Sequence, residues 1–332
     1  MTKVEVGLQN GSLFNDNPIL HATWLYYQEG KSQSEVADLM GVSRVTVVKY
    51  LQAARESGLV QISLDVNVFG AIDASLRIRE KFGLHRVIIV PDGEHVGKRN
   101  DRQLMQERLS RAGGMYLNQV IENNDVLGVA WGRTIHQMSK TMTPKSCKNV
   151  TVVQMLGSMP SQPDLTIIES SSQIAYKLSG RVASLHVPAV VSSARLAMEL
   201  QAEPIIRANF DVLTQCTKAF FVVGNALDEN PLIRVGVLSK KEMQAYRDLG
   251  AVGVICGRFY DKNGMPVVAD VDQRILGISL AQLRLIERKI FLAGGEQGYV
   301  ATLGALLGGY VTDLIIDEGT AEFLLACELA TS

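Results

Sequence analysis

The sequence predicts an α/β protein in which a small N-terminal helical domain precedes a large, doubly wound domain. Its 332 residues exceed the length of one ordinary domain. The pattern changes near residue 66, from closely spaced short helices to apolar, β-rich runs that alternate with helical patterns. Such alternation is typical of a mainly parallel sheet with helices on both faces.

Four segments are expected along the chain: a short frayed arm over 1–16, a helical domain over 17–66, a linking helix over 67–83 and a large domain over 84–332. Asn17 can cap the first helix, with Pro18 in its first turn and Gly30 at its end. The stretch GAIDASLRIREKFG favours a linking helix with charged faces.

The second and third helices have clear start and stop signals. Ser32 and Glu35 form a capping box for SQSEVADLM, which ends at Gly41. Ser43 can cap SRVTVVKYLQAARESG, which ends at Gly58. The next stretch, GLVQISLDV, alternates like a strand and resembles the wing of a winged domain.

These two helices have the spacing of a helix-turn-helix. Their shared apolar face is predicted to consist of Val36, Ala37, Met40, Val42, Val47 and Tyr50. Gly41 supplies the turn, and the second helix of such a pair enters the major groove of DNA. The alternative is a helical hairpin that only packs on the larger domain.

The outward positions at the start of the third helix are Ser43, Arg44, Val45, Thr46 and Lys49. Arg44 can bond guanine edges, while Val45 or the Thr46 methyl can contact thymine methyls. Ser43, Thr46 and Lys49 can hold phosphates. The chain's net charge is only −1 and the module itself is not basic, so we expect dimer avidity to assist DNA binding.

The large domain contains seven apolar runs suited to buried strands: HRVIIV, DVLGVAW, NVTVVQML, KAFFVVG, AVGVI, RKIFLAG and VTDLIID. In a doubly wound sheet, ligands bind at the carboxyl ends of the strands. We therefore look for the ligand site in the turns that follow these runs.

Several of those turns carry glycine and polar residues. In GVAWGRTI, Gly132 permits close approach, Thr134 offers a hydroxyl, and Arg133 can grip a phosphate or orient a polyol. Similar turns contain Gly157 with Ser158, Gly294 with Gly295, and Gly224 in VVGNALD. On one edge of a parallel sheet they would outline one crevice, although such turns are also ordinary connections.

The sequence offers little for catalysis. It has no P-loop, no GxGxxG fingerprint, no metal-ligand spacing and no serine, histidine and aspartate relay, so we expect no cofactor, no metal and no enzymatic activity. Asp317 and Glu318 could perform acid–base chemistry, but helix capping is the favoured interpretation. Four scattered cysteines, no long apolar run and no secretory signal predict a cytoplasmic protein that does not enter the membrane.

Several motifs together resemble the SorC family of bacterial transcriptional regulators. They are the helix-turn-helix with ATWLYYQEGKSQSEVA before it, then GVAWGRT, LGAVGVICGRFYDKNG, LAGG and VTDLIIDEGTA, in the same order across nearly the whole chain. The resemblance implies a winged helix-turn-helix joined to a sugar-binding domain related to glucosamine-phosphate deaminase and ribose-phosphate isomerase. It also implies a homotetramer whose effectors are sugars, polyols or their phosphates. The turns Gly132-Arg133-Thr134 and Gly157-Ser158 would line the effector pocket.

The sequence departs from the family pattern at two positions. Val254 stands where members commonly have an acid, and Gly298 stands where a lysine is common. These departures suggest an unphosphorylated or unusually small ligand, with Arg133 as its main polar anchor. Gly224, Val254, Gly295 and Gly298 complete the expected effector site.

The expected function is regulation of transcription. We expect a repressor of a sugar or polyol catabolic operon, which binds double-stranded operator DNA and is switched by a small carbohydrate effector. The alternative is a sugar-phosphate isomerase or deaminase with a helical appendage, in which Asp317 or Glu318 would be catalytic.

Overall fold

The computed structural model describes residues 17–60, 73–91, 101–159, 167–227 and 230–328. The chain divides into two compact units, Met1–Leu64 and Asp65–Ser332. The expected arm over 1–16 and the expected wing strand, from residue 61 onward, lie outside the described residues.

The first unit contains the helices α1 (Pro18–Thr23), α2 (Gln33–Met40) and α3 (Arg44–Glu56). A π-helical turn, η1 (Trp24–Gln28), continues α1. The capping box of Ser32 and Glu35 is present, and the Ser43 side chain caps α3. Gly41 ends α2 with a φ of 65°, a left-handed conformation that glycine adopts without strain.

The helices of this unit share one apolar core. Its buried members are Ala22, Leu25, Val36, Ala37, Val47 and Leu51, with Met40, Val42 and Tyr50 packed against them. The predicted shared face of α2 and α3 is therefore confirmed, and it fixes the side of α3 that remains exposed.

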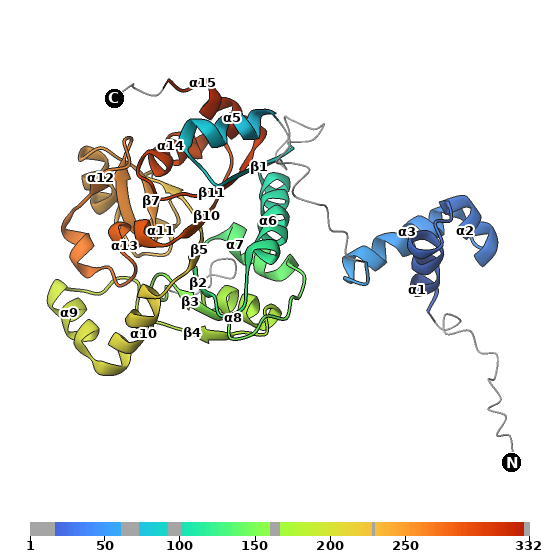
Figure 1. Ribbon diagram of the computed structural model, residues 1–332, viewed down its shortest axis with the longest axis horizontal. Coiled ribbons are helices and arrows are strands. Elements are labelled where there is room, and N and C mark those ends of the chain that lie inside the picture. The colour runs from blue at the N-terminus through green and yellow to red at the C-terminus, as the bar shows by residue number, and fades with distance from the viewer. Residues whose placement is uncertain (1–16, 61–72, 92–100, 160–166, 228–229, 329–332) are drawn as a thin grey trace, which may run out of the picture. The chain divides into compact units, whose positions relative to one another are not determined.

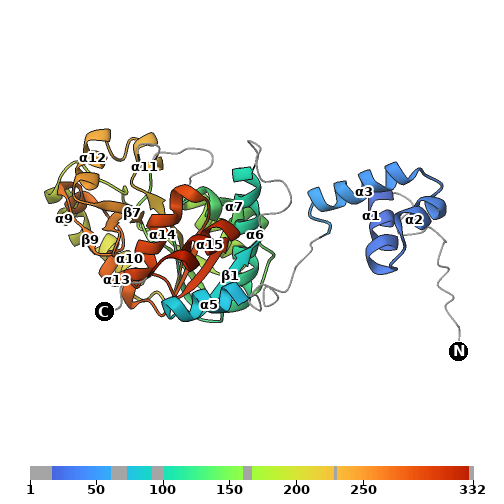
Figure 2. The ribbon, with the colours of Figure 1, turned by 90° about the horizontal axis from the view of Figure 1, so that it is seen from above.

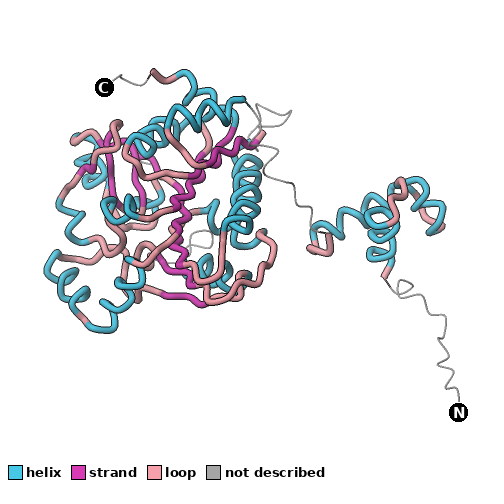
Figure 3. Tube along the Cα trace, in the orientation of Figure 1, coloured by secondary structure: helices cyan, strands magenta, loops and turns pink. Residues whose placement is uncertain are grey.

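The second unit is built on a seven-stranded parallel sheet, which Figure 3 shows as the magenta column through the domain. The strand order is β1-β11-β10-β5-β2-β3-β4. The strands are β1 (Arg86–Val90), β2 (Val126–Val129), β3 (Thr151–Gln154), β4 (Arg181–Ala183), β5 (Lys218–Val222), β10 (Arg288–Ala293) and β11 (Asp313–Asp317).

Alternate residues of the strands supply two cores on opposite faces of this sheet. In β1, Val87 and Ile89 belong to one core, and Ile88 and Val90 belong to the other. The helices α6 (Asp101–Val120), α7 (Arg133–Thr141) and α8 (Ile167–Lys177) cover one face. The other face carries α5 (Asp73–Phe82), α10 (Pro204–Thr214), α14 (Tyr299–Leu307) and α15 (Glu318–Ala326). The doubly wound architecture is thus confirmed.

One apolar run does not join the parallel sheet. AVGVI forms β7 (Ala251–Ile255) in a separate antiparallel sheet with β6 (Gly224–Asn225), β8 (Arg258–Asp261) and β9 (Pro266–Val267). A two-residue turn at Cys256 and Gly257, with φ of 48° and 79°, returns the chain on itself. Counting this run with the parallel strands was therefore wrong.

The remaining short helices surround the second sheet and the outer edge of the domain. They are α9 (Ala194–Ala202), α11 (Pro231–Arg234), α12 (Lys240–Asp248), η2 (Asp270–Arg274), α13 (Leu280–Leu285) and η3 (Glu296–Gly298). The charged linking helix was expected over 67–83, of which 67–72 lie outside the described residues; the described part contains α5, which packs on β1 and α15 within the second unit.

Candidate functional site

The chain order reverses between two neighbouring strands of the large sheet. From β2 the chain proceeds outward to β3 and β4, whereas from β5 it proceeds to β10 and β11 on the other side. Such a switch point leaves a crevice at the carboxyl ends of the two strands, because their following connections diverge.

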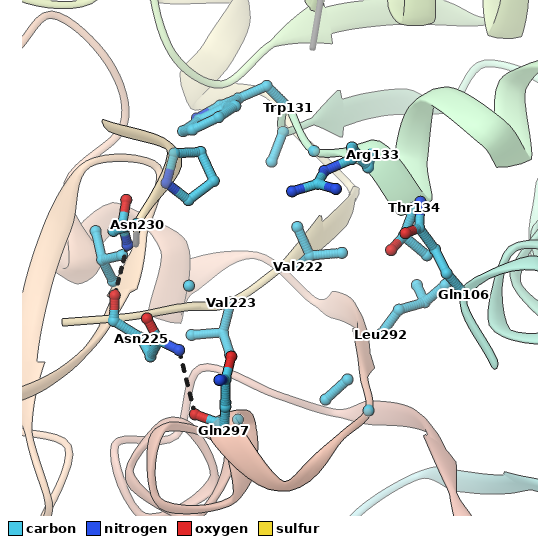
Figure 4. A pocket seen from close by; sticks show the side chains of 18 of the residues that line it. Gln106, Trp131, Arg133, Thr134, Val222, Val223, Asn225, Asn230, Leu292 and Gln297 are labelled. Atoms are coloured by element: carbon cyan, nitrogen blue, oxygen red, sulfur yellow. Dashed lines mark hydrogen bonds between the residues drawn. The ribbon is translucent and has the colours of Figure 1, made fainter. Parts of the chain in front are cut away.

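A cavity of about 620 Å³ lies at this position. Its walls come from the ends of β2, β5 and β10 and from the start of α7. Figure 4 shows the Arg133 side chain extending into it, between Trp131 and Val222. The volume is that of a pocket for a small molecule.

Most of the effector residues expected from the sequence meet in this cavity. Gly132, Arg133, Thr134, Gly224, Val254 and Gly298 all line it. Gly295 follows the lining residue Gly294 and donates its N–H to Asp317.

Gly157 and Ser158 are not among the described residues that line the cavity. Their backbone N–H groups donate to the carbonyls of Leu276 and Val187. A side chain at position 157 would lie 2.5 Å from the carbonyl oxygen of Pro188, so glycine serves close backbone packing there.

Two glycines of the cavity wall allow neighbouring valine side chains to pack closely. A Cβ at Gly132 would lie 2.7 Å from Cγ2 of Val222, and one at Gly224 would lie 2.9 Å from Cγ1 of Val254. Both distances are shorter than a contact between non-bonded carbon atoms, so a side chain at either position would force the neighbouring valine to shift. Gly298 differs, because a Cβ there would meet no atom within 4 Å.

Sequence reasoning missed several polar residues of the cavity: Arg102, Gln106, Asn225, Asn230, Arg234 and Gln297. Asn225 and Asn230 form part of the wall, since the Asn230 amide donates to the Asn225 carbonyl and the Asn225 amide donates to the Gln297 carbonyl at 3.4 Å (Figure 4). Asn225 and Gln297 stand next to Gly224 and Gly298 in turns that were expected to line the site, whereas Arg102, Gln106, Asn230 and Arg234 belong to no expected turn and reach the cavity through the fold.

The cavity is cationic. Arg102, Arg133 and Arg234 line it, and no Asp or Glu is present among its described lining residues. The N-terminus of α7 at Arg133 adds the positive end of a helix dipole. A cleft with one sign of charge attracts ligands of the opposite sign.

The candidate acid–base residues have structural contacts. Asp317 is buried and caps α15, accepting from the backbone N–H of Thr320 at 3.0 Å and of Gly295 at 2.8 Å. Neither Asp317 nor Glu318 lines the cavity. These contacts agree with the capping interpretation.

One cysteine lines the cavity, but its thiol is not activated. Burial raises the pKa of Cys256 to about 12, so it is protonated at neutral pH. The described residues also contain no cluster of three or more His, Cys, Asp or Glu side chains able to hold a metal ion. Within that part of the chain, no helix combines the length and apolar character needed to cross a membrane.

The expected DNA-reading residues lie together at the start of α3. Ser43, Arg44, Val45 and Lys49 are exposed, and Thr46 is half-buried. The hydroxyls of Ser43 and Thr46 are 2.8 Å apart, and Nε of Arg44 donates to Oε1 of Gln33 at 3.3 Å. Val48 is 39% exposed on the same helix and was not expected there.

Comparisons with known proteins agree with this two-part organisation. Residues 66–326 match the family model described as "Putative sugar-binding domain". The chain is 90% identical to "Uncharacterized transcriptional regulator YjhU" of Escherichia coli K12, over 96% of this chain and 98% of that protein. It is 33% identical to the deoxyribonucleoside regulator of Bacillus subtilis, over 92% of this chain and 96% of that protein.

A solved structure supports the fold. The full-length sorbitol operon regulator SorC of Klebsiella pneumoniae superposes with a TM-score of 0.75 at 23% identity, covering 94% of this chain and 99% of that chain. The resemblance found in the sequence motifs is confirmed by these matches. The chain therefore belongs to the SorC family of bacterial transcriptional regulators, with its sugar-binding domain over residues 66–326.

Proposed function

We propose that the protein represses a sugar or polyol catabolic operon and that a small carbohydrate in the cavity changes its affinity for operator DNA. The cavity carries this proposal, since its described lining residues include cations and amides but neither an acid nor an activated thiol. Such a lining suits recognition of a ligand rather than its conversion. Relatives named as a deoxyribonucleoside regulator and a sorbitol operon regulator support the same function.

The charge of the cavity favours an anionic effector. The sequence suggested an unphosphorylated or unusually small ligand, because Val254 and Gly298 replace a common acid and a common lysine. Arg102 and Arg234 also line the cavity and supply positive charge that was not expected, and a Cβ at Gly298 would meet no atom within 4 Å. We therefore propose a carbohydrate with one acidic group, a phosphate or a carboxylate, bound by arginine forks.

Calorimetry with three related probes tests this effector class. D-sorbitol 6-phosphate, D-gluconate and D-sorbitol share a six-carbon chain and differ in the acidic group. We expect one of the two charged probes to bind at least ~10-fold more tightly than sorbitol, because a charge-assisted hydrogen bond contributes about 1.5–3 kcal/mol.

The substitution Arg234→Gln should remove much of that preference. Arg195→Gln is the matched control, since Arg195 pairs with Glu199 on the surface and its side chain is 85% exposed. If sorbitol binds as tightly as the charged probes or more tightly, an anionic effector is contradicted. If Arg234→Gln and Arg195→Gln change probe affinity equally, Arg234 does not bind the probe.

DNA binding is tested with the fragment upstream of the protein's own gene and with a random duplex. Arg44→Ala should weaken the specific complex by about 5- to 150-fold, because a bidentate base contact contributes about 1–3 kcal/mol of discrimination. Lys49→Ala should weaken both complexes alike and reduce the salt slope by about one. Arg55→Ala, at the exposed far end of α3, is the control on the same helix.

Titration by fluorescence anisotropy over a salt series measures both effects. Circular dichroism checks the fold of Arg44→Ala, because that variant also loses its bond to Gln33. If Arg44→Ala and Lys49→Ala lower affinity equally on both duplexes, the assignment of base and phosphate contacts is wrong.

We further propose that the protein acts as a homotetramer in the cytoplasm and has no catalytic activity. A module without a strong basic charge gains affinity from binding several half-sites at once. Light scattering after size exclusion measures the assembly. Turnover of a sugar phosphate by the purified protein would instead favour the isomerase or deaminase alternative.

A further inference from the structure

Helix α15 is held at both ends by groups that belong to different parts of the second unit. It contains nine residues, so it is about 13 Å long. Ala321 and Leu324 on its inner face are buried in the core, next to β1 and β11.

The N-terminal end of α15 is bonded to the cavity wall. Asp317 caps the helix through Oδ1 and accepts the N–H of Gly295 through Oδ2 at 2.8 Å. Gly295 lies in the turn that spans 294–298, and three residues of that turn, Gly294, Gln297 and Gly298, line the cavity. One carboxylate therefore joins the turn to the start of the helix.

The C-terminal end of α15 is bonded to α5. Nζ of Lys81 donates to the carbonyl oxygens of Leu324 at 2.9 Å and Leu325 at 3.1 Å, and also to that of Cys327. These acceptors use all three hydrogens of the ammonium group. Helices α5 and α15 lie side by side in Figures 1 and 2, and they are in contact.

Helix α5 begins at Asp73, and in the chain it follows the residues that join it to the helix-turn-helix. We propose that α15 couples the cavity turn over 294–298 to α5, with Asp317 and Lys81 as the two positioning residues. Occupation of the cavity shifts the turn, the Asp317 carboxylate carries the shift to α15, and Lys81 carries it to α5. The regulatory meaning of this coupling rests on the proposed function.

Hydrogen exchange of the full chain tests the coupling without DNA or effector. Asp317→Asn keeps an oxygen to cap α15 but lacks the second acceptor for Gly295. We expect it to accelerate exchange in the distant peptide 73–82. Lys81→Met should accelerate exchange in 293–298 by about fivefold, given the usual strength of a cation at a helix C-terminus, and Lys81→Arg should restore protection.

Lys145→Met is the matched control. Lys145 also donates to carbonyls at a helix C-terminus, those of Asn118 and Ile121 near the end of α6. It should leave peptides 73–82 and 293–298 unchanged. The coupling is refuted if Asp317→Asn and Lys81→Met alter exchange only beside the substituted residue, or if Lys145→Met alters both peptides equally.

A second arm measures regulation with the probes D-sorbitol 6-phosphate, D-gluconate and D-sorbitol. Where a probe changes the operator affinity of the unsubstituted protein, we expect the operator affinity of Lys81→Met to differ by less than about twofold with and without that probe. The affinity of Lys81→Met for the probe itself should change by less than about threefold. An undiminished change in Lys81→Met overturns the coupling. A protein that binds no operator at all contradicts the proposed function, while the exchange experiment still decides the coupling.

Discussion

Replacing Lys218 by methionine should destabilise the second unit strongly. Nζ of Lys218 lies 2.7 Å from both carboxylate oxygens of Asp125, and the two side chains are only 8% and 7% exposed. The hydroxyl of Thr217 and the N–H of Glu122 also donate to this carboxylate, each at 2.7 Å. The pair joins the amino-terminal ends of β2 and β5, the strands that flank the switch point.

The expected cost follows from the burial of the pair. Lys218→Met leaves the Asp125 carboxylate buried with only two neutral donors, and breaking a buried ion pair in this way costs about 3–5 kcal/mol. For a domain of this size the loss corresponds to a decrease in Tm of about 6–20 °C. Adding Asp125→Asn to Lys218→Met removes the buried negative charge. The double variant should therefore recover a large part of the lost free energy of unfolding.

Differential scanning calorimetry of the single and double variants measures this coupling. Lys140→Met is the control, since Lys140 lies 3.9 Å from Glu169 with the two side chains 52% and 43% exposed. Such a surface pair contributes at most about 1 kcal/mol. A Lys218→Met cost no larger than that of Lys140→Met, or additive costs in the double variant, would refute the reasoning.

Two further predictions concern pH and the cavity. Burial alone would raise the pKa of Asp313, but hydrogen bonds, chiefly from the Arg288 guanidinium, lower it overall. Its stabilising contribution is therefore complete above the unfolded pKa near ~3.9 and is lost as pH falls through the lower folded pKa. Denaturant titrations at several pH values should show that the free energy of unfolding decreases less on acidification for Asp313→Asn than for the unsubstituted protein. The same pH dependence in both proteins would contradict this prediction. Gly298→Lys places a cation in the open space of the cavity, so calorimetry should show D-sorbitol 6-phosphate bound about 5- to 10-fold more tightly, with D-sorbitol unchanged. A loss of affinity for both probes would mean that the side chain blocks the cavity.

Local signals explain why the helices of the first unit could be predicted closely. A capping box needs only Ser32 and Glu35, and a left-handed turn needs only Gly41, so neighbouring residues suffice to place both helices. The exposed face of α3 then follows from its periodicity. In the large domain, continuous apolar runs identified most strands of the parallel sheet for the same reason.

Long-range assembly explains what the sequence could not reveal. An apolar run does not specify its partner strand, so AVGVI was counted with the strands of the parallel sheet. In the structure, positive φ angles at Cys256 and Gly257 turn the chain back and pair AVGVI in an antiparallel hairpin. Similarly, Arg102 and Arg234 are far apart in the chain, and only the topology brings them to one cavity. The β4 strand was missed because it has three residues and lies at an exposed edge.

The two ends of the large sheet offer different opportunities for protein engineering. Lys218 and Arg288 begin β5 and β10 and form ion pairs there, whereas Val222 and Leu292, at the other ends of the same strands, face the cavity. Libraries confined to the cavity end would leave these ion pairs intact while varying ligand preference. Variation confined to the cavity end would therefore allow this scaffold to be screened for biosensors of chosen small molecules while both ion pairs are retained.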